Sequence, residues 1–375
     1  MLLDLIAGAR PNFIKIAPII EAIRKEQMQG TDIEYRLIHT GQHYDRLMSS
    51  EFFKQLDIPE PDINLNARGE TQAELTSDIM LRYENVLQEV KPDLAMVVGD
   101  VTSTMACAIT AKKMNNIPLA HVEAGIRSGD LRMPEEINRI VTDAITDYFF
   151  TTTHTANENL RRMGVPENQL FFVGNTMIDT LLKQMPRFLK PDFWDALGLQ
   201  PGKYVVMTLH RPSNVDDEEK LEALLEAIME ASAGLPVIFP VHPRTAKVLK
   251  KINFVAHNLY LTDPMRYLQF NYLVKQAKVV VTDSGGITEE TTVMHVPCMS
   301  LRDTTERPET CTIGTSMLLG TEPTAIYPAF DKLFSGEWQK GGIPELWDGK
   351  TAERIIHTIK GLFTKQRQNK IIIDL

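Results

Sequence analysis

The fold of this chain is decided by one stretch, LAMVVGDVTSTMACAITAKKMNNIPLAHVEAG at residues 94–125. Two short apolar runs, 94–98 and 119–122, flank a longer helical pattern near residues 103–115. Apolar runs of this length, without polar alternation, are typical of strands that are buried on both faces of a parallel sheet. The stretch therefore predicts a strand–helix–strand unit with an acidic residue just after each strand.

The same alternation continues on both sides of this stretch. Further strands are expected at 2–7, 35–40, 148–152, 204–209, 237–241, 259–261 and 279–282. A segment with two prolines and two glycines, 189–204, separates two such series, and each series begins with a strand that runs into Arg-Pro. This shared feature fits either an internal duplication or a coincidence.

The alternation predicts an α/β fold with two Rossmann-like domains that face each other across a cleft. The first domain is expected to comprise residues 1–175 and a C-terminal helix at 352–375, and the second residues 176–351. Ligands of open α/β sheets bind at the carboxyl ends of the strands, so the chemistry should follow the strands.

Length and composition favour a globular protein. The chain has 375 residues, of which 43% are hydrophobic and 24% charged, and this balance excludes disordered and collagenous classes. Its 40 basic and 49 acidic residues give a net charge of −9. Because a nucleic-acid-binding surface is usually net basic, we expect no nucleic-acid partner.

Cysteine usage and hydropathy predict a cytoplasmic location. The three cysteines are far apart in the sequence, as expected in a reducing compartment. The first residues lack the charged region and cleavage site of a signal peptide. No run of 18 apolar residues occurs, so we expect no contact with a membrane.

In the first half, charged residues follow the expected strands. Arg10 and Lys15 lie at the start of a helix, which is a favourable place for an anion, although they also fit an ordinary surface. Asp100 and Glu123 follow two strands, and Glu135 opens a helix twelve residues after Glu123. Each acid alone could serve as a helix cap or first-turn acid. Together, carboxylates at one edge of a sheet can separate their pKa values and provide both an acid and a base.

The second half places polar residues after its strands as well. His210 and His242 each follow a strand, and Ser284-Gly285-Gly286 enters a helix. Such a glycine turn exposes backbone N–H groups to an anion such as a diphosphate. A carboxylate one to two turns further on, Glu289 or Glu290, could accept hydrogen bonds from ribose hydroxyls. Singly these residues fit caps or surface ion pairs, and together they indicate a nucleotide-diphosphate site.

Two other site classes are not supported. No metal site stands out among the nine histidines, and no GxSxG elbow of a serine hydrolase occurs. We therefore expect neither a metal ion nor a metal-dependent reaction.

The motif set resembles that of the non-hydrolysing UDP-N-acetylglucosamine 2-epimerases over essentially the whole chain. The blocks that carry the resemblance occur in order and at family-like spacing: GARPNFIKIAP (8–18), TGQH (40–43), GDVTST (99–104), HVEAGIRS (121–128), PEEINR (134–139), GN (174–175), TLHR (208–211), HPR (242–244), TDSGGITEE (282–290) and RDTTERPE (302–309). The family has the two-domain GT-B architecture, which agrees with the two Rossmann-like domains expected above.

The resemblance implies inversion at C2 of UDP-GlcNAc to give UDP-ManNAc, for surface polysaccharide precursors. The implied route is elimination of UDP to 2-acetamidoglucal and re-addition, without a cofactor. Asp100, Glu123 and Glu135 match the essential acids of the family, and Lys15 and His210 match other active-site residues. The resemblance leaves open which acid acts on which epimer. It also implies a homodimer.

The remaining site residues follow from the same resemblance. The implied contacts are with the leaving diphosphate for Arg10, His210 and Ser284-Gly285-Gly286, with the ribose for Glu290, with the uracil for Phe270, with the diphosphate or sugar for Arg307, and with the UDP-sugar for His242.

The chain departs from the family pattern at three places. The HRxEN block reads His210-Arg211-Pro212-Ser213-Asn214, and the GTN block reads Gly314-Thr315-Ser316. Tyr44 stands where members activated by their own substrate carry Arg, although Arg68 lies close to the second arginine of that site. We therefore expect UDP-ManNAc to be epimerised without added UDP-GlcNAc.

Three alternatives remain open at this point. The FIK start also occurs in UDP-2,3-diacetamido-glucuronate 2-epimerases, so that substrate is one alternative. A retaining GT-B glycosyltransferase shares the fold but has no need for a C2 base. A nucleotide-sugar-binding protein without catalysis would tolerate the loss of all three acids.

Overall fold

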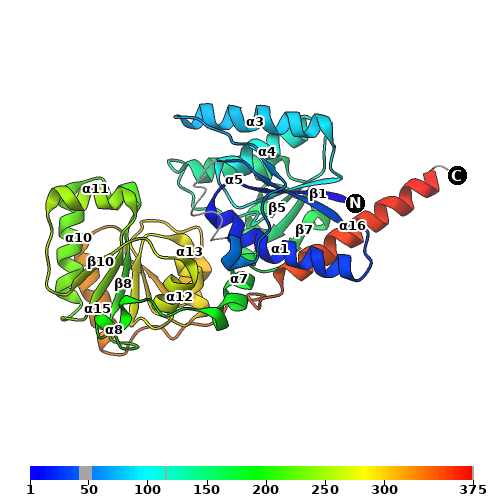
Figure 1. Ribbon diagram of the computed structural model, residues 1–375. Coiled ribbons are helices and arrows are strands. Elements are labelled where there is room, and N and C mark those ends of the chain that lie inside the picture. Colours follow the sequence, from blue (N-terminus) through cyan, green and yellow to red (C-terminus); the bar gives the residue numbers. More distant parts are fainter. Residues whose placement is uncertain (42–52, 115, 374–375) are drawn as a thin grey trace. The chain divides into compact units, whose positions relative to one another are not determined.

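A computed structural model describes residues 1–41, 53–114 and 116–373, with residues 365–373 described by their backbone alone. The chain divides into two units, of which the first comprises Met1–Lys183 with Glu345–Leu375 and the second Gln184–Pro344 (Figure 1). The sequence placed these boundaries at 175 and 352. The first unit extends further than the sequence predicted, because helix α7 (Thr176–Gln184) contacts it. The hydroxyl of Thr180 on this helix donates to the Ile14 carbonyl at 2.6 Å.

The first unit contains a seven-stranded parallel sheet. In spatial order its strands are β3 (Ile63–Asn64), β2 (Glu34–His39), β1 (Leu2–Ala7), β4 (Leu94–Val98), β5 (Leu119–Val122), β6 (Tyr148–Thr151) and β7 (Leu170–Phe172). The direction of strand order reverses between β1 and β4, as in a Rossmann fold. The carboxyl ends of β1, β4 and β5 are therefore neighbours.

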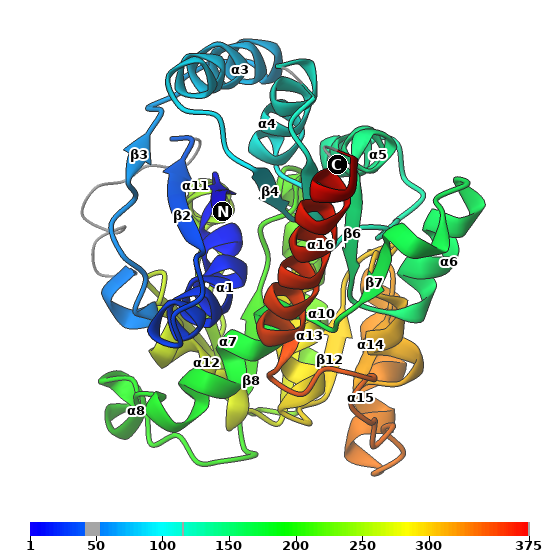
Figure 2. The same cartoon turned by 90° about the vertical axis from the view of Figure 1, so that its right-hand side faces the viewer.

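Helices cover both faces of this sheet. They are α1 (Arg10–Met28), α3 (Gln72–Glu89), α4 (Thr102–Lys113), α5 (Pro134–Ile145), α6 (His154–Arg162), α7 and α16 (Thr351–Ile373). Helices α3, α4 and α5 lie side by side on one face, and α1 and α16 lie on the other (Figure 2). Helix α16 packs on α1, with an ion pair between Lys360 and Glu26.

The second unit repeats this arrangement with six parallel strands. In spatial order they are β10 (Leu259–Thr262), β9 (Val237–Pro240), β8 (Val205–Thr208), β11 (Val279–Thr282), β12 (Cys298–Ser300) and β13 (Ser316–Leu318). Its helices are α8 (Phe193–Ala196), α9 (Pro212–Val215), α10 (Glu218–Ala231), α11 (Pro243–Ile252), α12 (Tyr267–Lys275), α13 (Gly285–Val293), α14 (Pro308–Thr312) and α15 (Ile326–Phe334). The short 3₁₀ helices among the described residues are Glu167–Gln169, Met185–Arg187 and Pro323–Ala325.

Alternate residues of the second sheet fill two separate cores. Val205 and Met207 of β8 pack with α10 and α15 on one face, whereas Val206 packs with α8 and α12 on the other. Both faces of these strands are therefore buried, which explains why their sequences are continuous apolar runs. The prediction of two Rossmann-like domains is confirmed. Among the described helices, none combines the length and apolar character needed to span a membrane.

Candidate functional site

In the first unit, a buried asparagine joins the ends of two strands. Asn12 lies in the first turn of α1, and its Oδ1 accepts hydrogen bonds from the N–H groups of Gly8 and Ala9 at 3.2 and 3.0 Å. Its Nδ2 donates to the Val98 carbonyl at 2.8 Å. The loop after β1 is therefore held against the end of β4, where the first candidate acid follows.

Lys15 and Glu123 form a buried ion pair beside this junction. Glu123 directly follows β5 and has a left-handed backbone with a φ of 72°, which is uncommon for a residue with a side chain. Gly99 also has a positive φ, of 68°, and a Cβ there would lie 3.2 Å from the ammonium nitrogen of Lys15. A side chain at position 99 would therefore be strained by the backbone conformation and would press on the ion pair.

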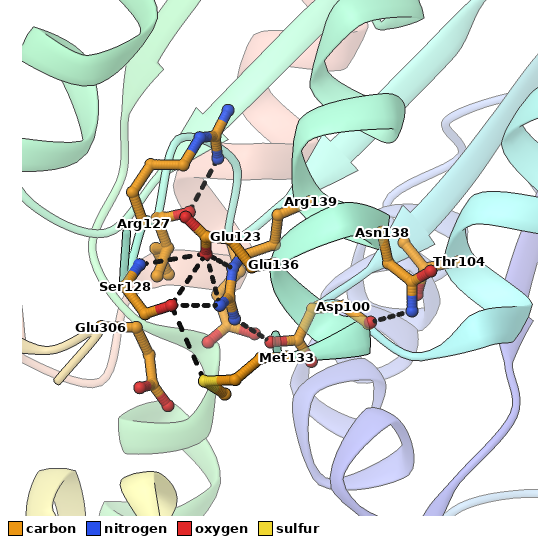
Figure 3. A network of polar contacts seen from close by, with 12 residues as sticks. Asp100, Thr104, Glu123, Arg127, Ser128, Met133, Glu136, Asn138, Arg139 and Glu306 are labelled. Atoms are coloured by element: carbon orange, nitrogen blue, oxygen red, sulfur yellow. Dashed lines mark hydrogen bonds and ion pairs between the residues drawn. The ribbon is translucent and has the colours of Figure 1, made fainter. Parts of the chain in front are cut away.

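Asp100 is held by two residues of α5. Arg139 forms an ion pair with the Asp100 carboxylate, and Nδ2 of Asn138 donates to the Asp100 carbonyl at 2.8 Å (Figure 3). Arg139 is 2% exposed, whereas the Asp100 side chain remains 31% exposed. The carboxylate is thus oriented from the protein side and accessible from the other.

The neighbouring acids Glu135 and Glu136 have different surroundings. The Glu136 carboxylate is 2% exposed and accepts hydrogen bonds from the N–H groups of Ser128 and Gly129, both at 3.0 Å, and from Arg139 (Figure 3). Burial raises the pKa of Glu136, but these donors outweigh burial and hold that pKa below its ordinary value. Glu135 is half-buried, and no other described residue pairs with its carboxylate. Glu136 therefore holds the loop at Ser128-Gly129, whereas the Glu135 carboxylate is available for proton transfer.

Two other residues named from the sequence, Arg10 and Arg68, are exposed residues of the first unit. Arg10 is the first residue of α1 and is exposed. Arg68 is exposed, and its backbone N–H donates to Asp78. Tyr44, on which the expectation about activation depends, lies outside the described residues.

In the second unit, Asp283 orients His210. Asp283 is fully buried after β11, and its Oδ1 lies 2.8 Å from Nδ1 of His210. The same carboxylate accepts from the backbone N–H groups of His210 and Arg211, and from Asn214. Burial raises the pKa of Asp283, but the contact with His210 and these donors keep that pKa below its usual range. The His210 ring is thereby fixed, with its side chain 40% exposed.

The Ser284-Gly285-Gly286 turn opens α13 next to this pair. Ser284 is the N-cap residue, and the two glycines are the first residues of the helix. A Cβ on Gly285 would lie 2.5 Å from Oε1 of Glu306, which is ion-paired with Arg302. A side chain at position 285 would therefore displace the Glu306 carboxylate and would crowd the N–H groups at the start of the helix.

Two acids of α13 have separate partners. Glu290 is 4% exposed and accepts hydrogen bonds from the Tyr267 hydroxyl at 2.9 Å and the Asn271 amide at 3.4 Å. Burial raises the pKa of Glu290 to about 7 despite these donors. Glu289 instead pairs with Arg307, with its Oε1 2.9 Å from Nε of the guanidinium. Of the two carboxylates left open by the sequence, Glu290 is the one without a cationic partner among the described side chains.

The last two expected residues also lie in the second unit. His242 caps α11, and its ring centroid lies 5.8 Å from that of His210. Burial and the charge of His210 lower the pKa of His242. Phe270 lies on α12 and packs half-buried against the core cluster that contains Tyr204.

Several residues of both sites were not predicted from the sequence. They are Asn12, His121, Glu136, Asn138, Arg139, Asp143 and Asp283, and most act through buried contacts with residues distant in sequence. All of them except Asp143 stand in a quoted motif block, and Glu136 and Asp283 stand directly beside an expected residue.

The residues of each unit suit a different kind of chemistry. In the first, Asp100, Glu123 and Glu135 follow adjacent strands or open α5, which suits proton transfer. In the second, a helix N-terminus with His210 and Arg307 in the same unit suits a diphosphate. No group of three or more His, Cys, Asp or Glu side chains in the described ranges could hold a metal ion.

Comparison with known proteins gives a consistent result. The family model for UDP-N-acetylglucosamine 2-epimerase matches residues 25–360. The chain is 39% identical to the UDP-N-acetylglucosamine 2-epimerase of Methanocaldococcus jannaschii, over 96% of this chain and 99% of that protein. A crystal structure of the M. jannaschii enzyme in complex with UDP-GlcNAc and UDP matches with a TM-score of 0.86, over 96% of this chain and 99% of that one. The UDP-2,3-diacetamido-2,3-dideoxy-D-glucuronate 2-epimerase of Pseudomonas aeruginosa is also 39% identical, over 84% of this chain and 87% of that protein.

Proposed function

Because the chain belongs to the UDP-N-acetylglucosamine 2-epimerase family, we propose that it interconverts UDP-GlcNAc and UDP-ManNAc. The observation that carries this proposal is the similarity over nearly the whole chain to an epimerase whose crystal structure contains UDP-GlcNAc and UDP. We propose that the product serves surface polysaccharide synthesis.

The acids of the first unit perform the proton transfers in this proposal. The proton at C2 is not acidic, so a carboxylate must take it while the bond between C1 and the diphosphate oxygen breaks. The C–H electrons form the C1=C2 double bond, and UDP leaves with the electrons of the C1–O bond. Re-addition reverses these steps after a proton is delivered to the opposite face of C2. Asp100, Glu123 and Glu135 supply the carboxylates, and Lys15 fixes Glu123 through its ion pair.

The leaving UDP is held mainly by groups of the second unit. In this proposal the N–H groups of Ser284-Gly285-Gly286 stabilise the diphosphate as negative charge develops on it, together with His210 and Arg307 of the same unit. Arg10, which belongs to the first unit, adds a further positive charge. His242 assists them. Glu290 and Phe270 bind the ribose and the uracil.

The assembly and location are part of the same proposal. We propose a homodimer, as the family resemblance implies, and light scattering of the purified protein measures its mass. We propose a cytoplasmic location, because all three cysteines are free, and two of them are buried.

The test is NMR of the purified protein with UDP-GlcNAc in D2O. The expected result is a ManNAc-configured product with deuterium at C2. A parallel sample with UDP-2,3-diacetamido-glucuronate tests the alternative substrate. If the protein turned over only UDP-2,3-diacetamido-glucuronate, that sugar and not UDP-GlcNAc would be its substrate. Binding of UDP-GlcNAc without exchange at C2 would contradict epimerisation altogether.

A further inference from the structure

The turn that carries Asp100 is held by side chains from four other elements. Three consecutive carbonyls accept hydrogen bonds: that of Val98 from Asn12 and Thr104, that of Gly99 from Nε2 of His121, and that of Asp100 from Asn138. These donors come from α1, α4, β5 and α5. Because a carbonyl only accepts, Nε2 of His121 is a donor, at 2.8 Å.

One carboxylate connects this turn to the loop that follows Glu123. Asp143 of α5 is fully buried, and its Oδ1 lies 2.7 Å from Nδ1 of His121. Its Oδ2 accepts from the Gly125 N–H at 3.0 Å and from Arg127 at 2.7 Å. Burial raises the pKa of Asp143, but His121 and Arg127 outweigh burial and keep that pKa below its ordinary value. The Asp100 turn and the Glu123 loop thus share one buried anchor.

The burial of this anchor decides what kind of role it has. The side chains of His121 and Asp143 are both 0% exposed, so neither can touch a substrate. Their partners are the backbone of Gly99 and Gly125, each next to or near a candidate acid. A displacement of a reacting group by about 1 Å lowers rates by about 10²-fold. Loss of the anchor should therefore affect turnover more than binding.

We propose that His121 and Asp143 are positioning residues that hold the Asp100 turn and the Glu123 loop for proton transfer at C2. The proposal rests on the epimerase function proposed above. It assigns to α5 a connection to all three acids. Glu135 lies on α5 itself, Asn138 and Arg139 hold Asp100, and Asp143 holds the loop after Glu123.

The experiment compares two amides at position 121. In His121→Gln the amide nitrogen reaches the place of Nε2 and can still donate to Gly99, whereas in His121→Asn it replaces Nδ1 and can reach only Asp143. We expect His121→Asn to lower kcat about 10²-fold with KM changed by less than about threefold. His121→Gln should stay within about tenfold of the wild-type kcat, because it keeps the bond to the Gly99 carbonyl that holds the Asp100 turn and loses only the bond to Asp143. Equal losses in the two variants, or a wild-type kcat in folded His121→Asn, would overturn the proposal.

A matched control separates positioning from general loss of stability. Asp4 is a fully buried carboxylate of the same sheet that pairs with Arg36 and the Tyr83 hydroxyl, and not with the Asp100 turn or the Glu123 loop. Asp4→Asn should lower the melting temperature and leave kcat unchanged. A loss of kcat in Asp4→Asn equal to that in His121→Asn would contradict the proposal. Should His121→Asn not fold, the isosteric Asp143→Asn replaces it, and a wild-type kcat there would contradict the proposal.

Hydrogen exchange gives a readout that does not depend on the reaction. In His121→Asn the amides of residues 99–102 should exchange faster than in the wild type, and in His121→Gln they should stay protected. Unchanged exchange in His121→Asn would refute the anchor itself. Inactivity of the wild type towards UDP-GlcNAc would instead refute the epimerase function and leave the exchange result to decide on the anchor.

Discussion

Gly99 is the residue at which the backbone and the ion pair of the first unit meet. Its φ of 68° disfavours any side chain, and a Cβ would lie 3.2 Å from Nζ of Lys15 and 3.4 Å from Oε2 of Glu123. A single methyl group would therefore act on both the turn and the Lys15–Glu123 pair.

We predict that Gly99→Ala lowers the free energy of unfolding by about 1–2 kcal/mol, the left-handed penalty, and also lowers kcat. The matched control is Gly164→Ala, because Gly164 has a φ of 85° and nothing within 4 Å of a Cβ. The control should lose similar stability and keep kcat. Thermal melts and initial rates measure both, and an unchanged kcat in Gly99→Ala would separate the turn from catalysis.

Glu135 and Glu136 allow a second comparison of adjacent residues. Glu135→Gln should lower kcat by about 10²–10⁴-fold, the usual contribution of a proton-transfer group, without changing the melting temperature. Glu136→Gln should destabilise the protein by about 3–5 kcal/mol, because it breaks the buried contacts with Arg139 and the Ser128 loop. Calorimetry and steady-state kinetics distinguish the two effects. A stable, inactive Glu136→Gln would reverse this assignment.

Sequence patterns point to residues that stand after strands, and they do not reveal which buried groups hold them. Asp100, Glu123 and His210 could be selected because each follows an apolar run within two residues. The partners could not: Asn12 and Val98 are 86 residues apart, and Arg139 and Asp100 are 39 apart. Such pairs form only when the sheet brings distant loops together. Of the Glu135-Glu136 pair, burial alone separates the structural residue from the accessible one.

At the level of elements, the contact between α12 and α13 carries a pH dependence. Glu290 of α13 has a pKa raised to about 7 by burial among Tyr267 and Asn271 of α12. The unfolded chain has the ordinary, lower value, so between the two values the folded state keeps a proton that the unfolded state has released. The stability contribution is fully present below the ordinary carboxyl pKa and is lost as the pH rises through about 7.

We predict that Glu290→Gln removes this dependence. Urea unfolding of the second unit at pH 5 and pH 8 should show the wild type losing on the order of 3 kcal/mol relative to the variant. Other acids contribute equally to both proteins and cancel in the difference. A difference between wild type and variant that is the same at both pH values would show that Glu290 keeps an ordinary pKa.

Strands were predictable in proportion to their burial and length. Leu2–Ala7, Leu94–Val98, Leu119–Val122 and Val279–Thr282 begin and end where the apolar runs do. Strands β3, β7, β12 and β13 were not predicted, because each has only two or three residues and three of them lie at a sheet edge. These short strands form because they pair with a neighbouring strand, and the sequence of two or three residues does not reveal that partner.

At the scale of the whole chain, Asp179 fastens the returning helix to the first unit. Its carboxylate accepts from the N–H groups of Thr351 and Ala352 at 3.1 and 2.7 Å, so a side chain of α7 caps the start of α16. The open N–H groups at a helix start need such an acceptor.

We predict that Asp179→Ala lowers stability by about 1–2 kcal/mol and accelerates hydrogen exchange in the first turns of α16. Glu353→Gln is the control, because its exposed contact with Lys25 at 3.4 Å contributes about 0–1 kcal/mol. Mass spectrometry of exchanged peptides locates the effect. Equal exchange in Asp179→Ala and the wild type would show that α16 is held by its apolar face alone.

The return of α16 also sets an order in which the nascent chain can acquire structure. The second unit is one continuous segment, Gln184–Pro344, whereas the first is completed only by residues from Glu345 onward. During synthesis from the N-terminus, the face of α1 that α16 covers stays open until the whole intervening segment has left the ribosome. Domains generally fold in order of their emergence. Here the later one can close its core first, and the earlier one waits for its last helix.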